Sequence, residues 1–218
     1  MTRVLVFCPV HPDKGLHPLT RAALDGLTYG ARDVWTAYGN NPYAGFSDIT
    51  DGRMNILHNY EAARTVFLAG PWDYLLTVES DMEPPANVIE QLLEADADLA
   101  YSLYVFRRSK RWSAYTKLVP GWGQSLSQDP AQAAALFGQT IPVAGMGLGA
   151  TLIRRAALEA VPFRGFHGMA CDGWLALDAQ TVGLTQKCVT ACVSGHVDGA
   201  EVLYPTLDTP ELYTVNYL

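Results

Sequence analysis

The sequence predicts an α/β protein built on a mostly parallel sheet. Three observations indicate this class: strand-like and helix-like runs alternate along the first 105 residues, the first run at residues 4–10 is continuously apolar, and no internal repeat breaks the order. With 218 residues, of which 49% are hydrophobic and 17% charged, the chain is long enough for one domain with an ample core. A disordered chain is therefore not expected.

The first half of the chain predicts four strands and three helices. The apolar runs expected to form strands are residues 4–10, 34–38, 74–78 and 99–105. Apolar residues recur at helical spacing over residues 18–27, over residues 56–67, and in a stretch carrying Val88, Ile89, Leu92 and Leu93. Pro84 and Pro85 are expected to open this third helix, because the first turn of a helix does not use the N–H that proline lacks.

Beyond residue 105 the alternation breaks. Residues 107–128 show neither period and are predicted to be a loop region. Helices are predicted near residues 131–136, over residues 155–160 and over residues 172–182, where Gly183 is placed as a C-cap. Strands are predicted at residues 151–153 and 186–192, and residues 197–218 are a tail that contains Tyr and Pro and shows no clear period.

Composition narrows the class of function. The chain has 15 Lys and Arg against 22 Asp and Glu, a net charge of −7, whereas a broad nucleic-acid-binding surface needs clustered positive charge. The longest uncharged stretch, residues 130–153, contains Pro142 and several glycines, so no membrane span is predicted. The apolar run at residues 4–10 is too short for a signal peptide, and four cysteines without a Cys-x-x-Cys pair suit reduced thiols. A cytoplasmic protein is expected.

The residues expected to carry chemistry follow the third strand, where Val78 is succeeded by Glu79, Ser80 and Asp81. In open parallel sheets, ligands bind beyond the carboxyl ends of strands. Carboxylates on a short turn suit Mg²⁺ or Mn²⁺, which take one or two protein carboxylates together with substrate phosphates. The alternative is a solvated turn whose charges interact with the positive end of the following helix.

This strand end resembles the Asp-x-Asp motif of the GT-A glycosyltransferases. The resemblance implies that Asp81 binds Mn²⁺ or Mg²⁺, and that Glu79, in place of the first Asp, lies towards the nucleotide ribose or the metal shell. It also implies that His196, in the segment Ser194-Gly195-His196, completes the metal shell. The resemblance extends over residues 3–197 and implies a GT-A-like domain with a mostly parallel central sheet flanked by helices.

Other segments resemble the donor-binding and catalytic parts of that family. The resemblance implies that Arg64 and Gly147 face the nucleotide-sugar, and that the loop containing Pro9 and His11 contacts the nucleobase and ribose. Asp172, near a helix start, resembles the general base of inverting members. The alternative for Asp172 is an N-cap that satisfies free N–H groups of the helix.

The function implied is metal-dependent transfer of a hexosyl or pentosyl group from a nucleoside-diphosphate sugar to an acceptor hydroxyl, with inversion and with Asp172 as base. A retaining reaction would use the same donor site without a dedicated base. Residues 1–105 would form the donor-binding half, residues 106–196 the acceptor and catalytic half, and residues 197–218 the tail. By analogy, the small size suits a phage or bacterial enzyme.

Positive charge concentrates at Arg107, Arg108, Lys110 and Arg111, interleaved with aromatic residues. Such a cluster suits contact with a nucleic-acid acceptor, for instance a hydroxymethylated base in DNA, whose phosphates and bases it would grip. It equally suits cover for the donor diphosphate, or a solvated loop. The last two interpretations are favoured, because the charges are few for a DNA-binding footprint.

Two other functions fit part of the pattern. A nucleotidyltransferase acting on a sugar phosphate would share the strand-end carboxylates and the metal, but it is expected to carry a Gly-rich, cationic phosphate loop after the first strand. Residues 9–15 hold one Lys and one Gly. A non-catalytic carbohydrate-binding module would give no reason for Asp81, Asp172 and His196 to converge.

Overall fold

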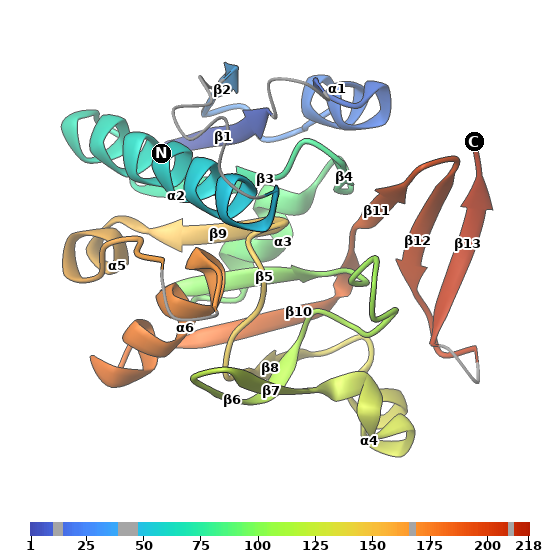
Figure 1. Cartoon of the computed structure of the whole chain (residues 1–218). Coiled ribbons are helices and arrows are strands. Elements are labelled where there is room, and N and C mark those ends of the chain that lie inside the picture. Colours follow the sequence, from blue (N-terminus) through green and yellow to red (C-terminus); the bar gives the residue numbers. More distant parts are fainter. Residues whose placement is uncertain (11–14, 39–47, 166–168, 209–211) are drawn as a thin grey trace.

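A computed structural model of the chain describes residues 1–10, 15–38, 48–165, 169–208 and 212–218. The described part holds a seven-stranded sheet, a four-stranded sheet and a two-stranded hairpin (Figure 1). Within it, no helix has the length and apolar character needed to cross a membrane. All four cysteines are buried and free of disulfides.

The large sheet has the strand order β2-β1-β3-β9-β5-β10-β8. Five of its strands, β2, β1, β3, β5 and β10, run in one direction, while β9 and β8 run against them. The sheet is therefore mostly parallel, as predicted. The strand bounds are β1 Val4–Val10, β2 Arg32–Tyr38, β3 Tyr74–Val78, β5 Leu99–Leu103, β8 Thr140–Pro142, β9 Ala150–Arg154 and β10 Gln186–Val193.

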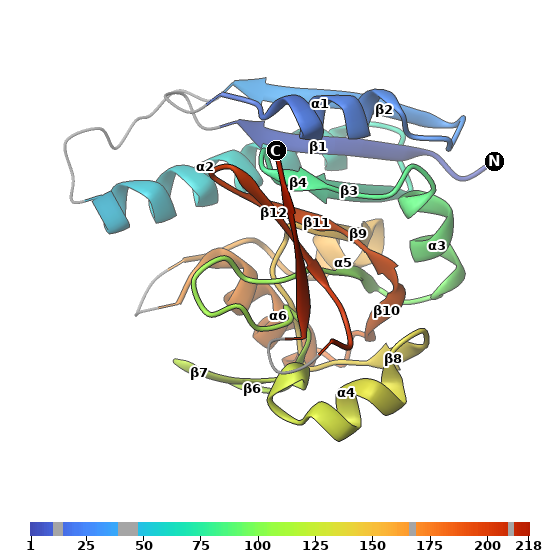
Figure 2. The same ribbon diagram turned by 90° about the vertical axis from the view of Figure 1, so that its right-hand side faces the viewer.

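Helices cover both faces of this sheet, and Figure 2 shows α2 and α3 on opposite sides of it. Side chains of α2, α5 and α6 pack in one apolar cluster with Leu5 and Phe7, whereas those of α1 and α3 pack in the other with Val4 and Val6. Successive residues of a strand point to opposite faces, so a strand buried on both faces is apolar throughout. The helix bounds are α1 Pro18–Asp25, α2 Asp48–Ala69, α3 Val88–Glu94, α5 Arg155–Ala160 and α6 Cys171–Thr181.

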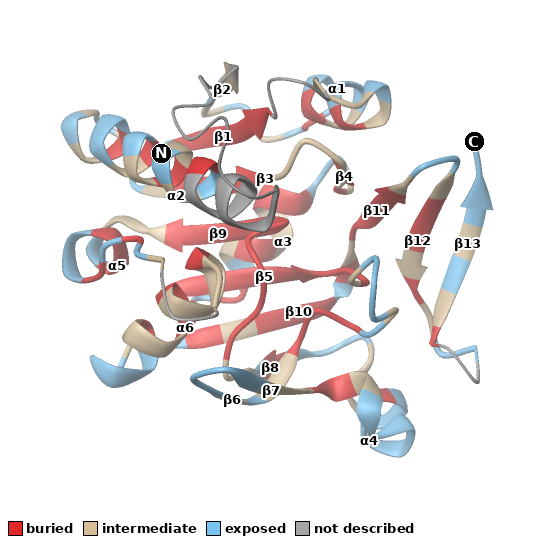
Figure 3. Cartoon of the chain, viewed as in Figure 1, coloured by how far each residue is buried: buried red, intermediate tan, exposed pale blue. Residues whose placement is uncertain are grey.

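A second sheet, of order β13-β12-β11-β4, stands at the right of the large sheet in Figure 1. Its strands are β4 Met82–Glu83, β11 Gly195–Asp198, β12 Glu201–Pro205 and β13 Tyr213–Tyr217. The tail at residues 197–218, which shows no clear period in the sequence, thus contains strands. These strands are short, and β13 is exposed along much of its length (Figure 3), so the residues alternate too briefly to be recognised as strands from sequence.

Regular structure also occurs in the region expected to be a loop. Strands β6, Tyr115–Val119, and β7, Trp122–Ser125, form an antiparallel hairpin whose turn contains Gly121 at φ +79°. A 3₁₀ turn at Leu126–Gln128 and helix α4, Pro130–Leu136, follow. The hairpin is half exposed and mixes apolar and polar residues without strict alternation, which is why sequence periodicity does not reveal it.

The two prolines after the acidic turn do not open a helix. Helix α3 begins at Val88, whose N–H donates to the carbonyl of Pro85 at 3.0 Å. Pro84 and Pro85 instead separate β4 from α3. The prediction was wrong because Met82 and Glu83 form β4. This strand pairs with β11, more than one hundred residues later, and a local pattern does not reveal such a pairing.

Candidate active site

The turn after β3 brings two carboxylates to the carboxyl edge of the large sheet. The N–H of Glu79 donates to the carbonyl of Gly149 at 3.0 Å, and the N–H of Met82 donates to the carbonyl of Glu79 at 3.0 Å. The carbonyl of Asp81 accepts from the N–H of Val197, in β11, at 2.9 Å. Backbone bonds to both sheets therefore hold Asp81 in place.

Asp81 lies between a histidine and an arginine from two other elements. Its Oδ1 is 3.8 Å from Nε2 of His196, in β11, and its Oδ2 is 2.8 Å from Nη1 of Arg107, in the loop after β5. The side chain of His196 is 7% exposed and that of Arg107 is 43% exposed. One partner of Asp81 is therefore fixed in the interior, and the other can move at the surface.

The surroundings of His196 define which nitrogen carries its proton. Nδ1 lies 2.7 Å from the carbonyl oxygen of Val105, an atom that can only accept, so Nδ1 is the donor. Burial lowers the pKa of His196 against the opposing charge of Asp81, which favours the neutral imidazole. Nε2 then presents a lone pair, and it is buried without a hydrogen-bond partner in the described part of the chain.

Two electron-rich atoms, Nε2 of His196 and Oδ1 of Asp81, thus face each other. A divalent cation between them would satisfy both, since imidazole nitrogen and carboxylate oxygen are ligands of Mn²⁺ and related ions. Among the residues that the structure describes there is no cluster of three or more His, Cys, Asp and Glu side chains placed to hold a metal. Two protein ligands match the pattern in which substrate phosphates and water supply the rest.

Glu79 lies in the most acidic part of the site. Removal from water, followed by the charges of Asp81 and Asp172, raises the pKa of Glu79 to about 8, while Arg107 and the hydroxyl of Tyr60 oppose the rise. Tyr60 comes from α2 and is fully buried. The neutral form of the Glu79 carboxyl is therefore favoured while no cation lies beside Asp81.

Asp172 borders a pocket of about 260 Å³, and its charge acts on Glu79 of the acidic turn. Its position is the second residue of α6, whose N-cap is Ala170, so Asp172 is not the N-cap. Its Oδ1 accepts a hydrogen bond from the N–H of Gly173 at 2.7 Å. The other residues lining the pocket, mostly apolar or aromatic, are Phe106, Tyr115, Leu118, Gly121, Trp122, Gly123, Met146, Met169, Ala170 and Gly173.

Gly147 brings the backbone between Tyr104 and Asp172. A Cβ atom at this position would lie 2.0 Å from the hydroxyl oxygen of Tyr104 and 3.3 Å from Oδ2 of Asp172. The hydroxyl of Thr151 donates to the carbonyl of Gly147 at 3.1 Å. The Tyr104 ring also packs edge-on against His196, with centroids 5.6 Å apart. Gly147 therefore lets the backbone pass between Tyr104 and Asp172, and the same Tyr104 ring contacts His196.

Arg64 contacts α5 in the structure, and its expected contact with a nucleotide-sugar stays a prediction. Its Nε donates to the carbonyl of Leu158, in α5, at 2.7 Å. Helix α5 follows Arg154, which pairs with Tyr74 at the amino end of β3. Arg64 lies one helical turn along α2 from Tyr60, whose hydroxyl acts on Glu79.

Of the two residues expected in the nucleobase loop, the structure describes Pro9 but not His11. Pro9 is buried at the carboxyl end of β1, where it pairs with Ala37 of β2. His11 lies outside the described residues. The role of both remains a prediction from the sequence.

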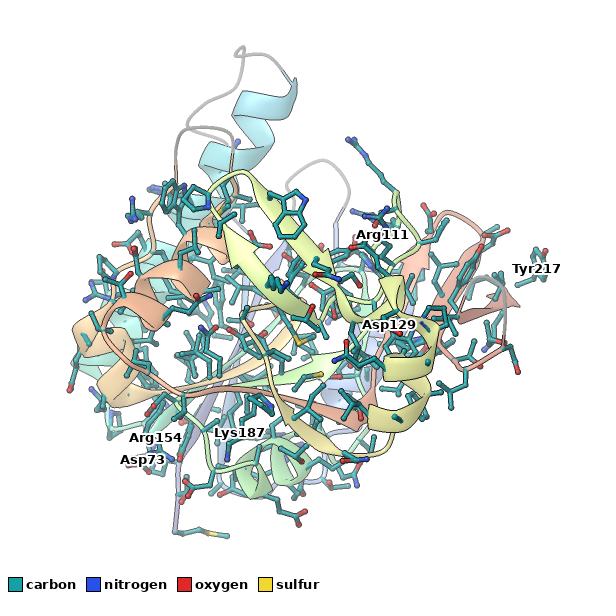
Figure 4. The ribbon with its side chains drawn as sticks, turned by 90° about the horizontal axis from the view of Figure 1, so that it is seen from below. Asp73, Arg111, Asp129, Arg154, Lys187 and Tyr217 are labelled. Carbon is teal, nitrogen blue, oxygen red and sulfur yellow. The ribbon has the colours of Figure 1, made fainter. Side chains whose placement is uncertain are left out.

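Two of the four cations expected to form a basic cluster are in ion pairs, and the other two are exposed. Arg107 is paired with Asp81, and Nζ of Lys110 is 3.0 Å from Oδ2 of Asp198. Arg108 and Arg111 are exposed. Figure 4 shows Arg111 on the opposite side of the molecule from Asp73 and Arg154, which mark the amino end of β3.

The sequence pattern does not single out Tyr60 or Tyr104 as site residues. Both occupy apolar positions, one on a helical stripe and the other in a strand-like run. The only available signal is that each carries a hydroxyl where phenylalanine would suffice for packing. The pairing of Arg107 with Asp81 leaves no local signal, because 26 residues separate them.

The sequence matches no protein-family model and no curated protein. Solved structures do match. A197 from STIV has a TM-score of 0.60 at 17% identity, over 93% of this chain and 90% of that chain. S. aureus TarS 1-349 in complex with UDP has a TM-score of 0.55 at 10% identity, over 87% of this chain and 58% of that chain. The structure of TarS 1-349 with UDP-GlcNAc gives 0.51 at 13% identity.

TarS is a glycosyltransferase of the GT-A type, and this chain shares its fold, here built on a mostly parallel seven-stranded sheet flanked by helices. This confirms the predicted fold class. The chain spans little more than half of the TarS fragment, 58% of its length, but nearly all of A197, 90%.

Gly147→Ala should destabilise the protein by about 1–3 kcal/mol, because the added methyl overlaps the Tyr104 hydroxyl in a packed interior. Urea denaturation measures the change. Tyr104→Phe in the same chain should restore most of it, since the next closest ring atom of Tyr104 would be 3.4 Å away.

Gly30→Ala provides the control, because no atom lies within 4 Å of the place that its added methyl would take. Its effect should stay within about 0.5 kcal/mol. Additive losses in the Gly147→Ala, Tyr104→Phe double variant would contradict the steric explanation.

Proposed function

We propose that this protein transfers a sugar from a nucleoside-diphosphate sugar to an acceptor hydroxyl. The observation that carries the proposal is the unpartnered Nε2 of His196 facing the Asp81 carboxylate, with Asp172 on an adjoining pocket. These groups lie at the carboxyl edge of the sheet, where open α/β folds bind ligands. The fold supports the proposal, since the solved TarS complexes hold UDP and UDP-GlcNAc.

The donor is proposed to bind through Mn²⁺ or Mg²⁺ held by Asp81 and His196. When bound, such an ion offsets the negative charge that develops on the departing diphosphate. Glu79, two residues before Asp81, is proposed to lie towards the nucleotide ribose or the metal shell. The backbone at Gly147 and the end of β1 at Pro9 are proposed to line the same donor site.

The acceptor is proposed to enter the pocket beside Asp172. The Asp172 carboxylate takes the proton of the acceptor hydroxyl while that oxygen bonds to the anomeric carbon, and the bond from the anomeric carbon to the diphosphate breaks. A single displacement of this kind inverts the anomeric configuration. Aromatic lining residues such as Phe106, Tyr115 and Trp122 suit the flat, weakly polar face of a ring.

A saccharide or other small molecule fits this acceptor site better than a hydroxymethylated base in DNA. Arg107 and Lys110 are engaged by Asp81 and Asp198, which leaves Arg108 and Arg111 as the exposed cations of the cluster. DNA binding depends on the neutralisation of several phosphates. We therefore propose that nucleic-acid contact, where it occurs, is local.

The direct test is product analysis with a panel of nucleoside-diphosphate sugars, Mn²⁺, and simple sugar acceptors. Glycosyl transfer releases a nucleoside diphosphate and forms a glycoside, both of which are separable by chromatography. Release of pyrophosphate from a nucleoside triphosphate and a sugar phosphate would instead identify a nucleotidyltransferase. Sugar binding without either product would identify a carbohydrate-binding module and end the proposal.

Asp81→Ala should abolish the metal-dependent binding of nucleoside diphosphate, because it removes the oxygen ligand paired with His196. The readout is the rise in melting temperature that a nucleoside diphosphate produces with Mn²⁺ and loses with EDTA. Asp208→Ala, which removes an exposed aspartate between β12 and β13, should keep the full rise. Equal stabilisation of the Asp81 variant and the parent would rule out a metal at this carboxylate.

Asp172→Asn should leave the affinity for donor nucleotide near that of the parent and lower the rate of transfer by about 10²- to 10⁴-fold, the usual contribution of a general base. Isothermal titration measures the first quantity, and steady-state turnover the second. Undiminished turnover in this variant would reject Asp172 as the base, while a parallel loss of donor binding would assign it to the donor site.

A further inference from the structure

Arg107 occupies an unusual place for a surface cation, because it sits against the carboxylate expected to hold a metal ion. Its Nη1 lies 2.8 Å from Oδ2 of Asp81, while Oδ1 of the same carboxylate faces His196. Asp81 is 26% exposed and Arg107 is 43% exposed. The ion pair between Arg107 and Asp81 is therefore partly exposed, whereas His196 on the other side of Asp81 is buried.

The loop that carries Arg107 is anchored at its base. The N–H of Phe106 donates to the carbonyl of Arg111 at 2.8 Å, and the N–H of Lys110 donates to the carbonyl of Phe106 at 2.8 Å. The ion pair between Lys110 and Asp198 ties the tip of the loop to β11. Arg107 can therefore change partners by rotation of its own side chain, without movement of the loop.

The charges around Asp81 show why this arginine is needed and what happens when a cation arrives. The carboxyl groups of Asp81, Asp172 and Glu79 lie close enough to influence one another. Arg107 forms an ion pair with one of them, Asp81. A divalent ion at Asp81 and His196 would share the carboxylate with Arg107. The two cations repel each other until an anion of higher charge lies between them.

We infer that Arg107 is a ligand of the donor diphosphate that Asp81 holds in position until donor and metal bind. The inference rests on the proposed function. On binding, the planar guanidinium exchanges the carboxylate Oδ2 for oxygens of the diphosphate, two of which it can bind at once. No covalent bond changes in this step, and the proton stays on the guanidinium.

This role produces effects of opposite sign on two affinities. Removal of Arg107 takes away a positive charge that competes for Asp81, so the affinity for Mn²⁺ alone should rise several-fold. The same removal takes away a charged hydrogen-bond donor to the diphosphate, so the affinity for nucleoside diphosphate at saturating Mn²⁺ should fall by about tenfold or more. A residue that only supports the structure of the site would weaken both.

The experiment compares the parent with Arg107→Ala, Arg107→Lys and Lys117→Ala. Mn²⁺ binding without nucleotide is measured by electron paramagnetic resonance of the free ion. Binding of UDP, GDP, ADP and dTDP at saturating Mn²⁺ is measured by calorimetry, and the nucleotide bound most tightly by the parent is used for the variants. Lys117→Ala removes an equal charge from the exposed face of the neighbouring β6 and should change neither affinity.

Stronger Mn²⁺ binding together with weaker nucleotide binding in Arg107→Ala, and a smaller loss of nucleotide affinity in Arg107→Lys, is the expected result. Unchanged nucleotide affinity in Arg107→Ala, or a loss of both affinities, would overturn the inference while leaving the proposed function standing. A parent protein that binds none of the nucleotides with Mn²⁺ would overturn both. Melting curves of all four proteins separate a folding defect from a binding defect.

Discussion

The backbone pairing of β4 with β11 is the constraint on which the candidate site depends. It sets His196 opposite Met82, one residue from Asp81, and the N–H of Val197 reaches the carbonyl of Asp81 at 2.9 Å. Backbone bonds of this kind define position far more tightly than a pair of flexible side chains could. The imidazole and the carboxylate are thus held close although their mutual contact is unfavourable without a cation between them.

The electrostatics of the site follow from this enforced proximity. Carboxyl groups from β3 and α6 gather at one edge of the sheet, which raises the pKa of Glu79, while burial keeps His196 neutral. The carboxyl groups and the lone pair of His196 repel one another, and a bound cation turns this repulsion into attraction. That property suits a ligand that arrives as a complex of a divalent ion and a diphosphate.

Structural similarity supports the fold of this chain, whereas the side chains of the site support its proposed function. A likeness at 10–17% identity establishes the fold alone: it covers 93% of the chain for A197 and 87% for TarS, which is of the GT-A type. Function on a shared fold depends on particular side chains. Here the inference of sugar transfer draws its weight from His196, Asp81 and Asp172, and the hairpin β6–β7 shapes the pocket in which an acceptor would lie.

Several parts of this protein could be predicted from local patterns in its sequence. The apolar run of β1, the strand β3, the helix α5 and the acidic turn at Glu79 and Asp81 are all readable, because each reflects burial or turn chemistry within a few residues. Only the folded structure shows that β4 pairs with β11, that Arg107 meets Asp81, and that Arg64 binds the carbonyl of Leu158. These contacts join segments that lie far apart along the chain, and the side chains involved carry no local signal of their partners.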